Sequence, residues 1–148
     1  MDWNLVFNGV NLGALFAWAA LILAPRWPAL LSAILYLGIG GFCALYAVVF
    51  ISVVSGLVPA ANEGADFTTI EGIRSIFSSD VGVVVGWTHY LAFDLFVGLW
   101  IARDADAKFF SRWLQAPILL ATFLAGPIGL IVWLIIREPR ARAKGRFQ

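Results

Sequence analysis

Four long apolar runs dominate this sequence and limit what it can fold into. They cover about residues 5–24, 29–58, 81–102 and 114–136. Each is long enough to cross the roughly 30 Å hydrocarbon core of a bilayer as a helix. Of the 148 residues, 61% are hydrophobic and 13% are charged, against about 25% charged in soluble proteins. We therefore expect an all-α integral membrane protein, with four transmembrane helices in a single membrane domain.

The connectors between the runs indicate where the helices end and what lies outside them. Residues 25–28 read Pro-Arg-Trp-Pro, which is typical of a short interfacial turn. The second run would make a helix of about 45 Å, so this helix must tilt, kink or project. After it, Thr68-Thr-Ile-Glu71 has the spacing of a capping box. This spacing predicts a short interfacial amphipathic helix between the second and third spans, although a plain surface connector fits as well.

The fourth run and the tail bear on shape and orientation. Ala125-Gly-Pro-Ile-Gly129 lacks a backbone donor in mid-helix and predicts a kink. The tail at 137–148 holds five basic residues, which we interpret as an anchor on anionic lipid. With four spans both termini lie on one side of the membrane. That side would hold six Lys and Arg residues, and the other side would hold four. This count predicts cytoplasmic termini. The first run lacks the basic start of a signal peptide, so we expect it to be a retained span.

The third run carries two ionisable side chains, His89 and Asp94, well inside its apolar stretch. An Asp at a helix centre costs roughly 2.5–3.5 kcal/mol on insertion, so the group must be paired, hydrated or protonated. Their sequence separation of five residues, at about 100° per residue, places the two side chains about 140° apart around the helix. Each must therefore find a partner on a different helix. Aromatic rings near both residues predict a slot for a long flat apolar molecule. These rings are Phe93 and Trp100 on the His89 face, and Trp87 and Tyr90 on the Asp94 face.

The polar residues of the first run share one helical stripe, at Asn4, Asn8 and Asn11. They either hydrogen-bond to neighbouring helices as packing contacts or form one wall of a polar pocket that faces His89 or Asp94. His89 is in turn either a hydrogen-bonded structural residue or part of a reactive site. No second histidine exists to complete a His-based metal or haem site, so we expect no metal and no cofactor.

A resemblance to a known family rests on the run Gly86-Trp-Thr-His-Tyr-Leu-Ala-Phe-Asp-Leu-Phe-Val-Gly-Leu-Trp100, on the Asp104 that follows it, and on Gly126-Pro-Ile-Gly129. These residues resemble the small four-span family of the abscisic-acid-deficient type, required for neoxanthin synthesis in plant plastids. The resemblance covers most of the chain and implies a membrane protein that acts on carotenoids. In the plant relative it implies conversion of violaxanthin to neoxanthin. In that reaction an epoxide opens, an adjacent polyene carbon loses a proton, and an allene forms without net oxidation.

The chain has no plastid transit sequence, so we expect a bacterial member in the inner (cytoplasmic) membrane. The chemistry needs a proton donor and a proton acceptor, and it predicts a cofactor-free acid/base isomerase of a xanthophyll end group. Asp94 would be the acid and His89 the base, or the reverse, on either side of one end group. The predicted binding residues are Asn8 and Asn11, whose amides would orient the oxygen, with Trp87, Tyr90, Phe93 and Trp100 around the ligand.

A different class of function fits the same residues. The protein would then hold a carotenoid, quinone or lipid without changing it, or assemble into a larger membrane complex. His89 and Asp94 would be interhelical hydrogen-bond partners, and a proton relay is a weaker third reading. The expected partners are a carotenoid or other long apolar ligand and the lipid bilayer, and the sequence also allows a homodimer. The basic residues are spread along the chain and form no nucleic-acid face.

Overall fold

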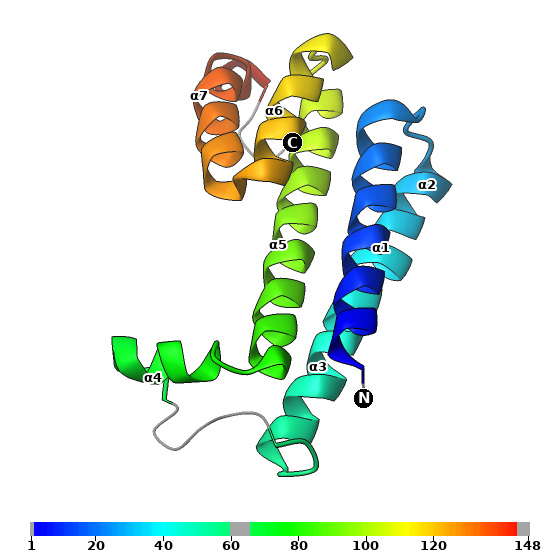
Figure 1. Ribbon diagram of the computed structural model, residues 1–148. Helices are drawn as coiled ribbons and strands as arrows, with labels where there is room; N and C mark the ends of the chain where they lie inside the picture. Colours follow the sequence, from blue (N-terminus) through cyan, green and yellow to red (C-terminus); the bar gives the residue numbers. More distant parts are fainter. Residues whose placement is uncertain (1, 60–65, 145–148) are drawn as a thin grey trace.

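The computed structural model describes residues 2–59 and 66–144, and every regular element within them is a helix (Figure 1). Three helices are long and apolar enough to cross a membrane: α1 (Trp3–Leu23), the continuous helix Pro28–Val54, and α5 (Asp80–Ala107). The predicted all-helical membrane fold is therefore confirmed. The fourth crossing is not.

The first two crossings have clear sequence causes at their ends. Asp2 caps α1 by accepting hydrogen bonds from the backbone N–H groups of Asn4 (3.0 Å) and Leu5 (3.2 Å). The helix stops before Pro25, where Ala24 is already extended. The second crossing starts at Pro28, because a proline at the first helical position costs no hydrogen bond.

The second crossing consists of three consecutive segments that form one helix. These are α2 (Pro28–Ala33), the π-helical segment η1 (Ile34–Ile39) and α3 (Gly40–Val54). The π segment is wider than an ordinary turn and lies where the helix meets α1 and α5. The helix ends at Val54 rather than near residue 58, because the chain turns at Gly56 with a φ of 76°.

A short helix, α4 (Ile70–Ile76), forms between the second and third crossings, as predicted. Its N-cap is Thr69 rather than Thr68, and the Thr69 hydroxyl accepts a hydrogen bond from the N–H of Gly72 (3.0 Å). Asp66 lies before this cap and accepts from the N–H groups of Thr68 (2.6 Å) and Thr69 (2.9 Å). Figure 1 shows α4 pointing away from the bundle at the end where α1 begins.

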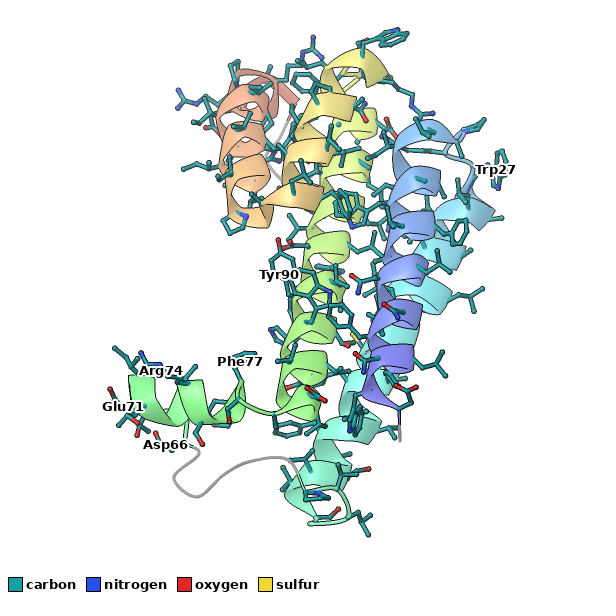
Figure 2. All side chains as sticks on the ribbon, in the orientation of Figure 1. Trp27, Asp66, Glu71, Arg74, Phe77 and Tyr90 are labelled. Carbon is teal, nitrogen blue, oxygen red and sulfur yellow. The ribbon has the colours of Figure 1, made fainter. Side chains whose placement is uncertain are left out.

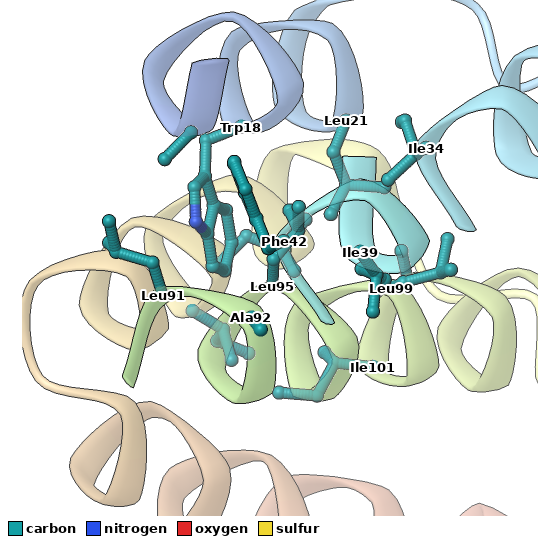
Figure 3. Close-up of a cluster of buried hydrophobic side chains, with 14 of the residues drawn as sticks. Trp18, Leu21, Ile34, Ile39, Phe42, Leu91, Ala92, Leu95, Leu99 and Ile101 are labelled. Carbon is teal, nitrogen blue, oxygen red and sulfur yellow. The ribbon is translucent and has the colours of Figure 1, made fainter. Parts of the chain in front are cut away.

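α5 is the centre of the fold and contacts α1, η1, α3, α6 and α7. Gly98 allows Trp18 of α1 to come close, because a Cβ at Gly98 would overlap the indole ring. Trp18 is buried and packs against Phe123 of α6, with 5.5 Å between ring centroids. Buried apolar side chains from α1, the second crossing and α5 surround this contact and form the core shown in Figure 3: Leu21, Ile34, Ile39, Phe42, Leu95 and Leu99.

The fourth apolar run folds into a helical hairpin instead of a crossing. α6 (Arg112–Leu124) has 13 residues, about 20 Å of helix, and α7 (Gly126–Lys144) runs back beside it (Figure 1). The reversal occurs at Ala125, whose backbone is not helical (φ −155°, ψ 77°). The two helices meet closely at Gly129, where a Cβ would overlap Thr122. The predicted kink at residues 125–129 is thus a complete turn of the chain.

Ion pairs connect the end of α7 to α5. The acceptor is the Asp104 carboxylate near the end of α5, and the side chains of Lys108 and Arg137 that pair with it are buried. It accepts hydrogen bonds from Lys108 Nζ (2.8 Å), Arg137 Nε (2.7 Å) and Trp133 Nε1 (3.1 Å). Between α1 and α2, Arg26 forms an ion pair with Asp106 at 3.0 Å.

Three crossings place the two ends of the described chain at opposite ends of the bundle. α1 begins at the end that holds α4, and α7 ends beside the last turns of α5 (Figure 1). The prediction that both termini lie on one side of the membrane assumed a fourth crossing, which the structure does not confirm. The turn at Ala125 sends α7 back toward the end from which α6 came. The side on which the termini lie stays a prediction.

Candidate functional site

The two ionisable residues of α5 lie in different surroundings. His89 faces α3, where its ring lies 5.6 Å from that of Tyr46, centroid to centroid. On α5 itself, the His89 ring stacks on that of Phe93 at 4.6 Å. Asp94 lies on the other side of α5, against the start of α7. The helical phase predicted this separation correctly. The structure does not bring His89 and Asp94 together around one ligand group.

An apolar cavity of about 410 Å³ opens beside His89, between α3, α4 and the first turns of α5. Tyr46 and His89 are the polar side chains in its lining, and the other side chains are apolar. The apolar walls come from α3 with Phe50, Val53 and Val54, from α4 and its flanks with Phe67, Ile73, Ile76 and Phe77, and from α5 with Val81 and Val85. An apolar group with one polar substituent matches this lining.

Two glycines allow α4 to form a wall of this cavity. A Cβ at Gly82 would overlap the carbonyl of Ile76, and a Cβ at Gly86 would overlap the Phe77 ring. The chain between α4 and α5 can therefore fold tightly against α5. Figure 2 shows Phe77 at the end of α4 nearest α5. The short helix predicted between the second and third crossings thus lines the cavity that contains His89.

The Asp94 carboxylate is buried at the tip of the hairpin. A Cβ at Gly126 would overlap this carboxylate, so only glycine allows so close an approach. The Tyr90 hydroxyl and the backbone N–H of Gly126 are the hydrogen-bonding groups that face it, while Oδ2 lacks a hydrogen bond of normal geometry within the described residues. Gly126 begins α7, and a helix N-terminus attracts negative charge. Figure 2 shows Tyr90 on α5 below the turn between α6 and α7.

A row of polar and aromatic contacts connects Tyr90 to α1. The ring of Trp87 stacks on that of Tyr90 at 5.1 Å between centroids, and Trp87 Nε1 donates a hydrogen bond to Asn11 Oδ1 at 2.9 Å. Phe7 packs on the other side of Trp87 at 6.1 Å. Asn11, Trp87, Tyr90 and Asp94 therefore lie along one face between α1, α5 and the hairpin. These contacts join α1 to α5 at a partly exposed face, where Trp87 is 38% exposed.

The remaining predicted binding residues are dispersed. Asn8 is exposed on α1, as is Asn4, whereas Asn11 is half-buried. Phe93 packs on His89, and it is 56% exposed on the outer surface of α5. Trp100 lies two turns further along, under the Arg137 guanidinium at 5.4 Å. The roles of these residues in binding stay predictions.

Sequence reasoning missed Tyr46, which lines the cavity beside His89. The signal was present, because Tyr46 and Phe50 are four residues apart and stack on one face of α3 at 5.6 Å. Tyr36, which lies in η1 of the same crossing, is 73% exposed on the bundle surface.

The family described as ABA4-like, or ABA DEFICIENT 4-like, matches residues 5–133 of this chain. No curated protein matches the chain, and no solved structure does.

Proposed function

The chain belongs to the ABA4-like family, and we propose that it is a membrane-embedded acid/base isomerase of a carotenoid end group. The family ties the chain to neoxanthin and abscisic acid synthesis, which is carotenoid chemistry. The observation that carries the proposal is the apolar cavity with His89 and Tyr46 in its lining. A ring end group with one oxygen fits its volume and its chemistry, while the polyene extends along the apolar surface of the bundle.

The reaction requires two proton transfers and no oxidant. A donor protonates the epoxide oxygen as its bond to the ring carbon breaks. A base removes the proton from the adjacent polyene carbon, and that electron pair forms the new double bond. Tyr46 would be the donor and His89 the base, since their rings are neighbours in the lining. A proton passing from the imidazolium back to the phenolate would then restore both groups.

Asp94 has a different position in this proposal. It lies outside the cavity lining and against Gly126, so it would hold the hairpin in place rather than contact the ligand. Its prediction as a catalytic acid is tested by Asp94→Asn, which keeps the shape and the acceptor oxygen. Pigment conversion retained in Asp94→Asn assigns it the positioning role. Conversion lost in a folded, pigment-binding Asp94→Asn protein assigns it to catalysis.

The test is expression in a carotenoid-producing host, with extracted pigments chromatographed beside those of the same host lacking the protein. We expect a changed xanthophyll, and we expect His89→Gln and Tyr46→Phe each to lower its yield at least tenfold. Tyr36→Phe is the matched control, because that tyrosine lies in the same crossing but is exposed outside the cavity. Full conversion by both cavity variants would overturn the proposed roles.

The strongly apolar lining also favours a second candidate function, which is binding of a carotenoid or lipid without reaction. The same preparation separates the two. Protein purified in mild detergent that carries an unaltered pigment, with no new product in the host, identifies a binding protein.

A further inference from the structure

The charged residues are distributed very unequally between the two ends of the bundle. At the end where α5 stops and α7 ends, seven basic side chains are described: Arg26, Arg103, Lys108, Arg112, Arg137, Arg140 and Arg142. Their contacts place them there. Arg112 donates to the carbonyl oxygen of Ala24 at 2.7 Å, and Arg140 to that of Phe109 at 3.0 Å. Among the described residues of the opposite end, Arg74 is the one basic side chain.

Acidic residues occur at both ends, so the basic residues determine the difference in charge. The end with Arg74 also holds Asp2, Asp66, Glu71 and Asp80, and its described side chains carry a net negative charge. The α7 end holds Asp104, Asp106 and Glu138, and its described side chains carry a net positive charge. Membrane proteins retain Lys and Arg on the cytoplasmic side close to their spans. The count of six against four from the sequence assumed four crossings. With three crossings and a hairpin that returns to the α7 end, the described basic residues number seven at that end and one at the other.

We infer that the α7 end of the bundle is cytoplasmic and that the cavity beside His89 takes its ligand from the opposite, extracytoplasmic leaflet. The inference about the ligand rests on the proposed function of the cavity, whereas the orientation does not. The ligand class is a long apolar molecule with a ring at its end, already dissolved in that leaflet.

The depth of the cavity agrees with this leaflet. Its lining comes from the last turns of α3, from α4 and from the first turns of α5. His89 lies nine residues after Asp80, about 14 Å along the helix, which is within one half of a roughly 30 Å hydrocarbon core. Phe67 just before α4 and Ile70 at its start are exposed, at 74% and 72%, as expected of a segment that lies in the interface. The cavity mouth therefore lies at the level of that leaflet's lipid.

Single cysteines test the orientation directly. In a Cys43→Ala background, Glu71→Cys places a thiol on α4 and Ser111→Cys places one at the start of α6, and both positions are exposed. Bacterial cells with a permeabilised outer membrane are treated with a membrane-impermeant maleimide. We expect at least tenfold more labelling at position 71 than at position 111, with equal labelling after the inner membrane is disrupted. The reverse ratio, or equal labelling before disruption, would overturn the inference.

A second cysteine tests the route of the ligand. Phe67 lines the cavity and is exposed, so Phe67→Cys allows a bulky impermeant maleimide to be attached at its mouth from outside the cell. We expect labelling to lower pigment conversion at least fivefold, while the same label at Glu71→Cys leaves it unchanged. Unchanged conversion in fully labelled Phe67→Cys protein would overturn entry by this route. The proposed function would stand, since the unlabelled variant reports conversion by itself.

Discussion

The carboxylate of Asp94 lies so close to the α-carbon of Gly126 that no side chain can be added there without displacing it. This contact joins the midpoint of the longest helix to the tip of the hairpin. It also gives the turn at Ala125 a polar partner inside the protein, because the buried Gly126 presents its backbone N–H to this carboxylate.

Gly126→Ala should therefore destabilise the bundle, by about 1–3 kcal/mol as for other overpacked sites. Thermal unfolding in mild detergent, followed by circular dichroism, measures the effect. Gly41→Ala is the matched control, since a Cβ at Gly41 meets no atom within 4 Å. That control should be neutral or slightly stabilising, by up to about 1 kcal/mol, because alanine favours the helix. Equal losses in the two variants would contradict a specific contact at Gly126.

Removing the acceptor at the open end of the hairpin should be more damaging. Asp104→Ala leaves Lys108 and Arg137, which are 1% and 8% exposed, without this counter-charge. Loss of one partner of a buried ion pair typically costs about 3–5 kcal/mol. Arg142→Gln breaks an exposed pair with Glu138 and should change the melting temperature little, since such pairs contribute about 0–1 kcal/mol. A small, similar loss in both variants would show that the Asp104 cluster is not what fastens α7.

Filling the cavity should abolish ligand binding without unfolding the protein. Val85→Phe adds a ring on the cavity side of α5, whereas Val83→Phe adds one at a position outside the lining that is 40% exposed. We expect the pigment that copurifies with the protein to fall at least fivefold in Val85→Phe and to stay unchanged in Val83→Phe. The melting temperatures of the apo forms check that both variants fold. Undiminished pigment in Val85→Phe would place the ligand elsewhere.

The cap before α4 should be insensitive to pH over the physiological range. Hydrogen bonds from Thr68 and Thr69 lower the pKa of the exposed Asp66 to about 2. A carboxyl whose pKa is lower in the folded state stabilises the fold above its unfolded value near 3.8, and this contribution is lost as the pH falls through about 2. Asp66→Asn removes the charge at every pH, so it should weaken this cap at neutral pH. Hydrogen exchange of the α4 amides measures the effect. Unchanged protection of these amides in Asp66→Asn would contradict a stabilising role of Asp66.

Much of this fold could be predicted because its causes are local. The apolar run at 81–102 and the helical period were sufficient to separate His89 from Asp94, and the structure confirms that separation. The capping spacing predicted the start of α4 to within one residue.

The reversal at Ala125 could not be predicted in the same way. A glycine and a proline within an apolar run are compatible with a kink and with a hairpin, and tertiary contacts decide between the two. In this protein the contacts that favour the hairpin are the close approach of Gly129 to Thr122 and the ion pair between Arg137 and Asp104. Tyr46 was missed for a related reason. Its spacing to Phe50 is visible in the sequence, but the cavity that both residues line depends on the position of α4.

The hairpin also has a consequence for biosynthesis. Neither α6, at about 20 Å, nor the apolar part of α7, residues 126–136 at about 16 Å, is long enough to cross a roughly 30 Å hydrocarbon core by itself. Both helices pack on α5. We therefore expect the hairpin to reach its final shape only after α5 is in place. A chain stalled after Ala107 would hold Asp94 before Gly126 exists, and Asp104 before Trp133 and Arg137 exist.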